Sequence, residues 1–403
     1  MKKITLHGFA LLLTVSLCTT TYAAKYKPIN EIPHSVPETE EEQQIWDIGR
    51  AHQKEVRETG EVVNDPDMEQ HLEALAAQLM GEMVETIGLE MNVLIFKDPT
   101  VNAWVYPDGT IAVQTGLLAE LKNEAQLAAI LGHEISHFLN RHAYIQIKSK
   151  QKQSAIGKGL GLLATAAVAA KTGSLNTGLM DTGQIWADLV TSGYSRKLET
   201  KADEQGLQLM IAAGFDPNQA LPAFEALRIK DDNETNLSQI WSSHPDIDSR
   251  LKNIKKQIKK LKSPPLFTPA EHTYIEKYGT ALLVDAQLDM QQRRYQRADN
   301  SLKRYTSIIK TEPLAFFMLG ENIRKQHPEG PDFAARLDAY QQAINADSNY
   351  AKAYKELGMA YRQQQLYERA SAALEQYLSL APEAVDAPII RWYLDNMPQE
   401  TAL

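Results

Sequence analysis

His133-Glu134-Ile135-Ser136-His137 lies inside an apolar pattern that begins at Asn123 and continues past Phe138. Apolar residues recur there at helical spacing, and Asn123 followed by Gln126 resembles a capping box, so the stretch is predicted to be a helix. Side chains four residues apart project from one helical face, which lets His133 and His137 bind one metal ion. Glu134 is then the candidate general base, taking a proton from water and passing it to a leaving amine. The competing interpretation is two surface histidines on an amphipathic helix.

A second helical pattern supplies the candidate third ligand. A catalytic zinc site has three protein ligands and an open position for water. Glu199 and Asp203 lie four residues apart at the start of a pattern that continues through Ile211. Glu199 can therefore bind the metal while Asp203 orients a ligand imidazole. On spacing alone, a solvated helix face fits these two carboxylates equally well.

Taken together, His133-Glu134-x-x-His137 and Ser195-Arg196-x-x-Glu199-x-x-Ala202-Asp203 resemble the M48 family of zinc metallopeptidases. The resemblance implies one zinc ion per chain, with His133, His137 and Glu199 as ligands, Glu134 as general base and Asp203 as support for a ligand. It covers about residues 40–260 and includes further matching segments: Asn102-Ala103-Trp104, Pro107-Asp108-Gly109, Gly116-Leu117-Leu118, Ser243-His244-Pro245 and Arg250.

The accessory segments each fit more than one chemical role. Asn102-Ala103-Trp104 is predicted either as an edge strand that pairs with an extended peptide substrate or as an ordinary core strand. His244 fits two roles, donation to the oxyanion of the reaction or occupation of the fourth metal position. Arg250 fits an oxyanion role, which the resemblance favours, or anchorage of a helix start. His142 points away from the ligand face and is expected to be structural or to support a ligand.

The beginning of the chain is typical of a secretory signal peptide over residues 1–23. Two lysines precede an apolar run from Gly8 to Leu17, and Thr21-Tyr22-Ala23 supplies small residues for cleavage. The sole cysteine, Cys18, lies within this segment, so the processed protein needs no disulfide. A lipid anchor at Cys18 is disfavoured because Leu17 is bulky. The prediction is a secreted, periplasmic protein.

Composition and charge limit the remaining classes. With 403 residues, 43% hydrophobic and 23% charged, the chain is large enough for two globular domains. A formal net charge of −9 disfavours nucleic acid or an anionic membrane as the main partner. The acidic run Glu38–Glu42 is expected to form a solvated first helical turn. Residues 155–170, rich in glycine and alanine, fit a buried helix, a lid or a peripheral membrane contact.

A proline-rich segment divides the sequence into two predicted parts. Residues 24–262 are expected to form an α+β, mainly helical zincin-like peptidase domain with a small β-sheet, and residues 263–269 a linker. Residues 270–403 are expected to form an all-α tetratricopeptide-like solenoid. Residues 351–384 fit that template closely, with more degenerate units around Phe316 and Leu302 before them and a closing segment at 388–394.

The whole arrangement predicts a zinc endopeptidase whose repeats recruit a substrate or partner. It resembles envelope members of the M48 family, which implies unfolded or misassembled outer-membrane proteins as substrates and the outer-membrane barrel-assembly machinery as a partner. The alternative is a tetratricopeptide adaptor or chaperone with a latent or structural zinc site. A hydrolase of non-peptide envelope material fits the candidate edge strand less well.

Overall fold

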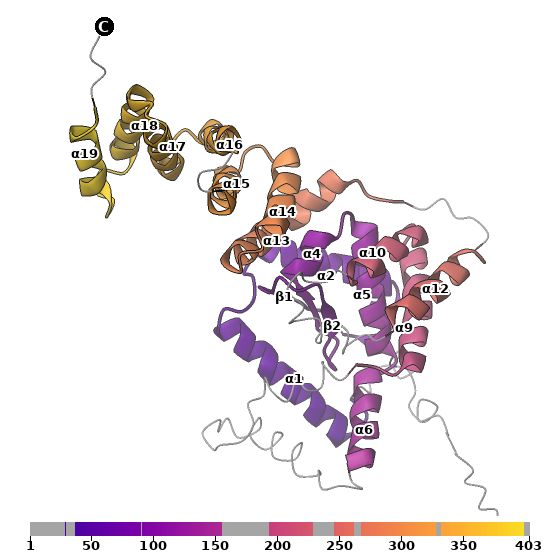
Figure 1. Ribbon diagram of the computed structural model, residues 1–403. Helices are drawn as coiled ribbons and strands as arrows, with labels where there is room; N and C mark the ends of the chain where they lie inside the picture. The colour runs from indigo at the N-terminus through magenta and orange to yellow at the C-terminus, as the bar shows by residue number, and fades with distance from the viewer. Residues whose placement is uncertain are drawn as a thin grey trace, which may run out of the picture.

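The computed structural model describes residues 29, 37–89, 91–154, 193–228, 246–261, 267–327 and 332–398. The signal-peptide and Cys18 predictions, residues 155–170 and His244 lie outside this described part. Within it, the predicted fold class is confirmed: a mainly helical domain with a small sheet is followed by a row of helices that projects from it (Figure 1). Among the described helices, none combines the length and apolarity needed to cross a bilayer.

The first domain packs helices around one small sheet. Its helices are α1 Glu40–Glu58, α2 Pro66–Met80, α3 Met83–Ile87, α4 Thr115–Glu120, α5 Glu124–Leu139, α6 His142–Ser154, α9 Arg196–Ala212, α10 Ala220–Ala226 and α12 Ile247–Ile258, with a 3-10 turn, η3, at Pro217–Gln219.

The described sheet has the order β1-β3-β2, with strands β1 Val93–Phe96, β2 Ala103–Val105 and β3 Ile111–Gln114. β1 runs parallel to β3, and β2 runs antiparallel to it. The outer side of β1 is covered, because Val63 N donates to Ile95 O at 2.7 Å and Lys97 N to Glu61 O at 2.8 Å. β2 has β3 on one side and no strand partner among the described residues on the other. The predicted substrate strand therefore forms an edge of the described sheet.

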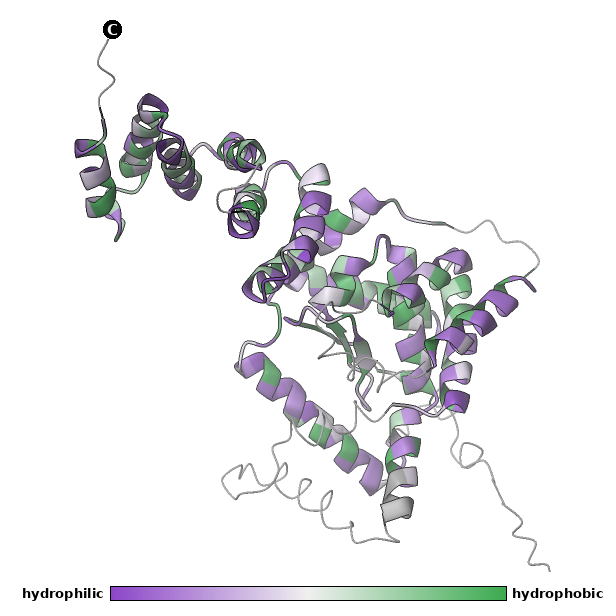
Figure 2. Cartoon of the chain, in the orientation of Figure 1, coloured by the Kyte–Doolittle hydropathy of each residue, from purple (hydrophilic) through white to green (hydrophobic). Residues whose placement is uncertain are grey.

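Helix α5 is the central element of this domain. Asn123 caps its first turn by accepting from Gln126 N at 3.0 Å, as the sequence predicts. Every residue from Ala125 to Leu139 is buried, because α2, α9, α10 and β2 pack around the helix. Figure 2 shows hydrophobic residues gathered on these central elements and hydrophilic residues on much of α1 and α12. His133, Glu134 and His137 are therefore buried in the core together with the apolar residues of α5.

The two helices after the predicted linker, α13 Glu271–Gln291 and α14 Tyr295–Ile308, pack against this core. Tyr274 Oη donates to Leu118 O at 2.8 Å, and Tyr278 Oη to Glu124 at 3.0 Å. Arg304 Nη2 donates to Leu121 O at 2.9 Å. The buried core that contains α5 also includes Tyr274 and Tyr278, so it continues across this interface.

The remaining helices are α15 Pro313–Gln326, α16 Phe333–Ala346, α17 Ala351–Gln363, α18 Tyr367–Leu380 and α19 Ala387–Asp395. α15 pairs with α16, α17 pairs with α18, and α19 packs against α18 (Figure 1). The best-predicted repeat, 351–384, corresponds to α17 and α18, where Gly358 approaches Leu374: a Cβ at Gly358 would lie 2.7 Å from the Leu374 side chain. Tyr377 closes the same pair and is buried. Small residues at such crossings let two helices approach closely.

Candidate metal centre

Two glycines set the crossing of α5 and α9. A Cβ at Gly132 would lie 2.9 Å from Gly206 O, and a Cβ at Gly206 would lie 2.8 Å from His133 N. No real Cβ contact is that short against backbone, so the helices touch only because both residues lack side chains. This close contact brings the first turns of α9 beside the histidines of α5.

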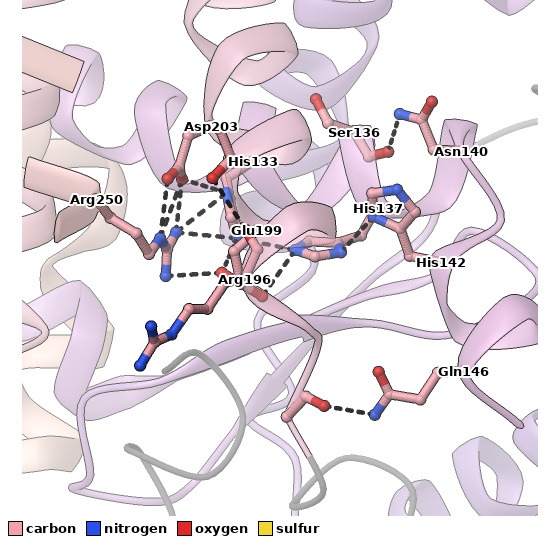
Figure 3. A network of polar contacts seen from close by, with 12 residues as sticks. His133, Ser136, His137, Asn140, His142, Gln146, Arg196, Glu199, Asp203 and Arg250 are labelled. Carbon is pink, nitrogen blue, oxygen red and sulfur yellow. Dashed lines mark hydrogen bonds and ion pairs between the residues drawn. The ribbon is translucent and has the colours of Figure 1, made fainter. Parts of the chain in front are cut away.

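Three predicted ligands converge at the crossing. His133 Nε2 lies 3.0 Å from His137 Nε2, and each of these atoms lies 3.5 Å from an oxygen of Glu199 (Figure 3). One ligand atom from each of the three side chains falls within 4.8 Å of the others, and all three residues are buried. Two imidazole nitrogens and one carboxylate oxygen are the donor set of many catalytic zinc sites. These residues fit zinc.

The other imidazole nitrogens have partners that orient the rings. His133 Nδ1 lies 3.0 Å from Asp203 Oδ1, which leaves Nε2 to face the metal position. His137 Nδ1 lies 2.9 Å from His142 Nδ1. Burial, with the nearby Lys201 charge, lowers the pKa of His142 to about 3, so this imidazole is neutral. His142 can then accept a proton shared from His137 Nδ1, which leaves His137 Nε2 with its lone pair.

The charge balance of the site also depends on these neighbours. Burial and the charge of Arg250 lower the pKa of His133, but hydrogen bonds to Asp203 and Glu199 outweigh them and raise it to about 9. Burial alone would raise the pKa of Asp203, yet the Arg250 charge and hydrogen bonds from His133 and Arg250 hold it below its usual value. Asp203 therefore stays ionised and able to orient the imidazole.

Arg250 lies against the carboxylates of α9. It projects from α12, with Nη1 2.8 Å from Glu199 Oε2 and Nη2 2.7 Å from Asp203 Oδ1. Its Nε also donates to Asp203 Oδ2 at 2.9 Å. The guanidinium thus bridges Glu199, a candidate ligand, and Asp203, which orients His133. Neither of the two roles predicted for Arg250 from the sequence included these contacts.

Tyr194 is a site residue that the sequence analysis missed. It directly precedes Ser195, the N-cap of α9, and its ring stacks on His137 at 4.0 Å between centroids, with an interplanar angle of 20°. Burial raises the pKa of its hydroxyl above the usual range, with smaller contributions from Glu134 and Glu199. Its position directly before the Ser195-Arg196 motif is the only sequence feature that could have indicated a role in the site. That position alone does not distinguish a site residue from an ordinary structural tyrosine.

Helix α1 contacts the site through an ion pair between its Glu42 and Arg141. Arg141, which follows the α5 C-cap and has a positive φ of 55°, is buried and donates from Nε to Glu42 Oε1 at 2.8 Å. A second bond joins Arg141 Nη2 to Glu42, and Nη1 donates to Glu38 at 2.5 Å. The expectation of a fully solvated acidic turn is therefore wrong for Glu42, because a cation 99 positions later covers it. The next residue is His142, so this ion pair fixes the turn that presents His142 to His137.

Replacing Gly206 by Ala is expected to destabilise the chain by about 1–3 kcal/mol, because the new Cβ forces α5 and α9 apart. The ligands move with their helices, so zinc should also be retained less tightly. Urea unfolding and zinc retention after dialysis would measure both effects. Gly49→Ala on α1 is the matched control, since its Cβ meets Tyr106 at an ordinary 3.4 Å. Equal behaviour of the two variants would contradict the crossing argument.

Replacing Asp203 by Asn is expected to lower zinc affinity by about 10–100-fold, the usual effect of losing a carboxylate that orients a ligand imidazole. Glu204→Gln removes the same charge from the exposed side of α9 and should leave affinity unchanged. Competition with a chromogenic chelator would compare the two. Similar losses in both would mean that charge, and not the Asp203–His133 contact, controls binding.

Comparison with known proteins adds an independent observation. Residues 64–258 match the model of peptidase family M48. The chain is 24% identical over 285 residues to the beta-barrel assembly-enhancing protease of Escherichia coli K12, covering 70% of this chain and 57% of that protein. It is 33% identical over 167 residues to the mitochondrial metalloendopeptidase OMA1 of Schizosaccharomyces pombe, covering 41% and 46%. The chain thus spans about half the length of these relatives.

Proposed function

We propose, from the premise that residues 64–258 belong to peptidase family M48, that this chain is a zinc-dependent endopeptidase. The observation that carries the proposal is the buried convergence of His133, His137 and Glu199, with Glu134 on the same helix. Zinc held by these side chains would polarise a scissile carbonyl and acidify water.

The chain's own groups have separate proposed roles. The Glu134 carboxylate accepts a proton from the attacking water and delivers it to the departing amide nitrogen. Asp203 and His142 hold the ligand imidazoles, and Arg250 holds Glu199 and Asp203 in place instead of polarising the oxyanion, because its guanidinium already contacts both carboxylates.

The edge strand gives this site a proposed means of holding a substrate. β2 packs against α5, and its free side among the described residues offers backbone donors and acceptors to an extended chain. Asn102, Ala103 and Trp104 would contribute to that pairing. An unfolded segment can present its backbone in this way, whereas a folded one has already paired it.

The cellular setting is also proposed. The name of the bacterial relative refers to β-barrel assembly, and the predicted signal peptide would direct the chain to the periplasm. We infer that the substrates are unfolded or misassembled envelope proteins, outer-membrane proteins among them. We further propose that the peptidase domain comprises residues 24–262, that residues 263–269 are a linker, and that residues 270–403 form the helical repeats. These repeats would recruit the substrates or dock the enzyme on the barrel-assembly machinery.

The deciding experiment is cleavage of unfolded casein by the purified chain, before and after removal of metal with a chelator. Cleavage should disappear with the metal and return when one equivalent of zinc is restored. A chain that binds both zinc and casein without cutting would support the adaptor alternative.

The His244→Ala variant distinguishes the two roles predicted for His244. Lower activity would indicate contact with the oxyanion, and higher activity would indicate a fourth ligand that restrains the enzyme.

A further inference from the structure

The second half of the chain contains a pocket of about 490 Å³ among α15, α16, α17 and α19. Four cationic side chains line it, against the two carboxylates of Glu356 and Asp386. The cations are Arg324, Arg336, Lys355 and Arg362. This excess of positive charge contrasts with the formal net charge of −9 for the whole chain.

Two of these cations are already paired with carboxylates. Lys355 Nζ lies 3.0 Å from Asp386 and 3.5 Å from Glu356. Arg324 Nη2 lies 2.6 Å from Glu321 on its own helix. The carboxylates of Asp386, Glu356 and Glu321 are therefore already paired with Lys355 or Arg324.

Arg336 and Arg362 have no carboxylate partner among the described residues. Arg336 is only 4% exposed, and its Nε has no hydrogen-bond partner in the described part of the chain. Its Nη2 donates to the neutral Gln363 side chain at 3.0 Å. Arg362 is half-buried and stacks over the Tyr393 ring at 4.1 Å. A buried guanidinium without an anion is costly, so a pocket that holds one is prepared for an anionic ligand.

The pocket also has an apolar margin. Ile389 lines it and is 57% exposed, and Met359 lies on the facing helix α17. A ligand that carries both a carboxylate and an adjacent aliphatic group would satisfy the planar donors of Arg336 and cover this margin. A small inorganic anion would meet only the first requirement.

We propose that this pocket binds an acidic segment of another protein, in which a Glu or Asp carboxylate meets Arg336 and Arg362 while a neighbouring apolar side chain covers Ile389. The inference extends the proposed recruiting role of the repeats by naming the chemistry that they recognise. It does not require the peptidase site to be active.

The test is a binding measurement on the full chain carrying Glu134→Gln. The probe is a fluorescent peptide of repeating Glu-Leu-Ser units blocked at both ends. It should bind saturably and more weakly as salt increases. The same peptide with Gln for Glu should lose binding by about tenfold or more, since bonds to a charged partner are lost. A free-ended Gln peptide tests whether a terminal carboxylate is the ligand instead.

Variants of the chain complete the design. Arg336→Gln and Arg362→Gln should each weaken the Glu peptide severalfold or more, while Lys352→Gln, an exposed charge on α17 outside the pocket, should not. Arg362 is only half-buried, so this variant decides the matter if Arg336→Gln fails to fold. Equal binding of the Glu and Gln peptides, an equal loss in Lys352→Gln, or binding of the free-ended peptide alone would overturn the proposal. Any of these results would leave casein cleavage as a separate question.

Discussion

Replacing Glu134 by Gln is expected to lower the rate of peptide hydrolysis by roughly a hundredfold to ten-thousandfold, the range over which positioned general acids and bases contribute. The amide keeps the shape of the carboxylate but cannot accept the proton of water. Because Glu134 is buried on α5 between the candidate ligands, an isosteric replacement should preserve packing and zinc content.

The measurement is kcat/KM on an unfolded fluorogenic substrate, with zinc stoichiometry and thermal unfolding recorded for the same samples. Glu204→Gln is the control, because it makes the same change at an exposed position on α9. If Glu134→Gln retained near-normal kcat/KM with zinc bound, Glu134 would not be the base. The adaptor alternative would then be favoured if the unaltered chain were also inactive.

Replacing Glu42 by Ala is expected to destabilise the chain by about 3–5 kcal/mol, the usual cost of removing one partner of a buried ion pair. The Arg141 guanidinium would remain buried after losing the buried Glu42, although its contact with the partly exposed Glu38 would persist. Since Arg141 directly precedes His142, the variant should also loosen the support of His137. Urea unfolding with and without zinc would measure both consequences.

Two companion variants separate the ion pair from general charge effects. Glu41→Ala removes a neighbouring carboxylate that is 63% exposed and should change stability by less than about 1 kcal/mol. Glu42→Leu combined with Arg141→Met removes both charges and should recover much of the loss. Equal destabilisation in Glu41→Ala and Glu42→Ala would contradict the role assigned to the buried pair.

Local patterns predicted much of this molecule because their signals lie within one element. The helix of the metal motif begins where Asn123 caps it, and the repeat at 351–384 forms the helix pair α17–α18. The position of β2 at a sheet edge also agrees with one of its two predicted interpretations. The convergence of His133, His137 and Glu199 was expected from motif spacing and family resemblance, and their roles in metal binding stay a prediction.

Contacts between distant elements could not be predicted in the same way. The burial of Glu42 depends on Arg141, and the approach of α9 to α5 depends on two glycines whose importance appears only when the helices cross. Arg250 was predicted at the site, but its carboxylate partners require the placement of α12 beside α9. Such long-range pairings have no short-range signature in the sequence.

The attachment of α13 and α14 to the first domain has a consequence for how such a chain can change. Tyr274 and Tyr278 fill the same core as α5, and Arg304 binds the carbonyls at the end of α4. A proteolytic nick in residues 263–269 would therefore leave the two fragments associated. Helices after α15 could be gained or lost during evolution with little effect on the metal centre, because none of the described residues beyond α15 belongs to the core around α5. Removal of α13 would instead expose the core residues that Tyr274 and Tyr278 cover.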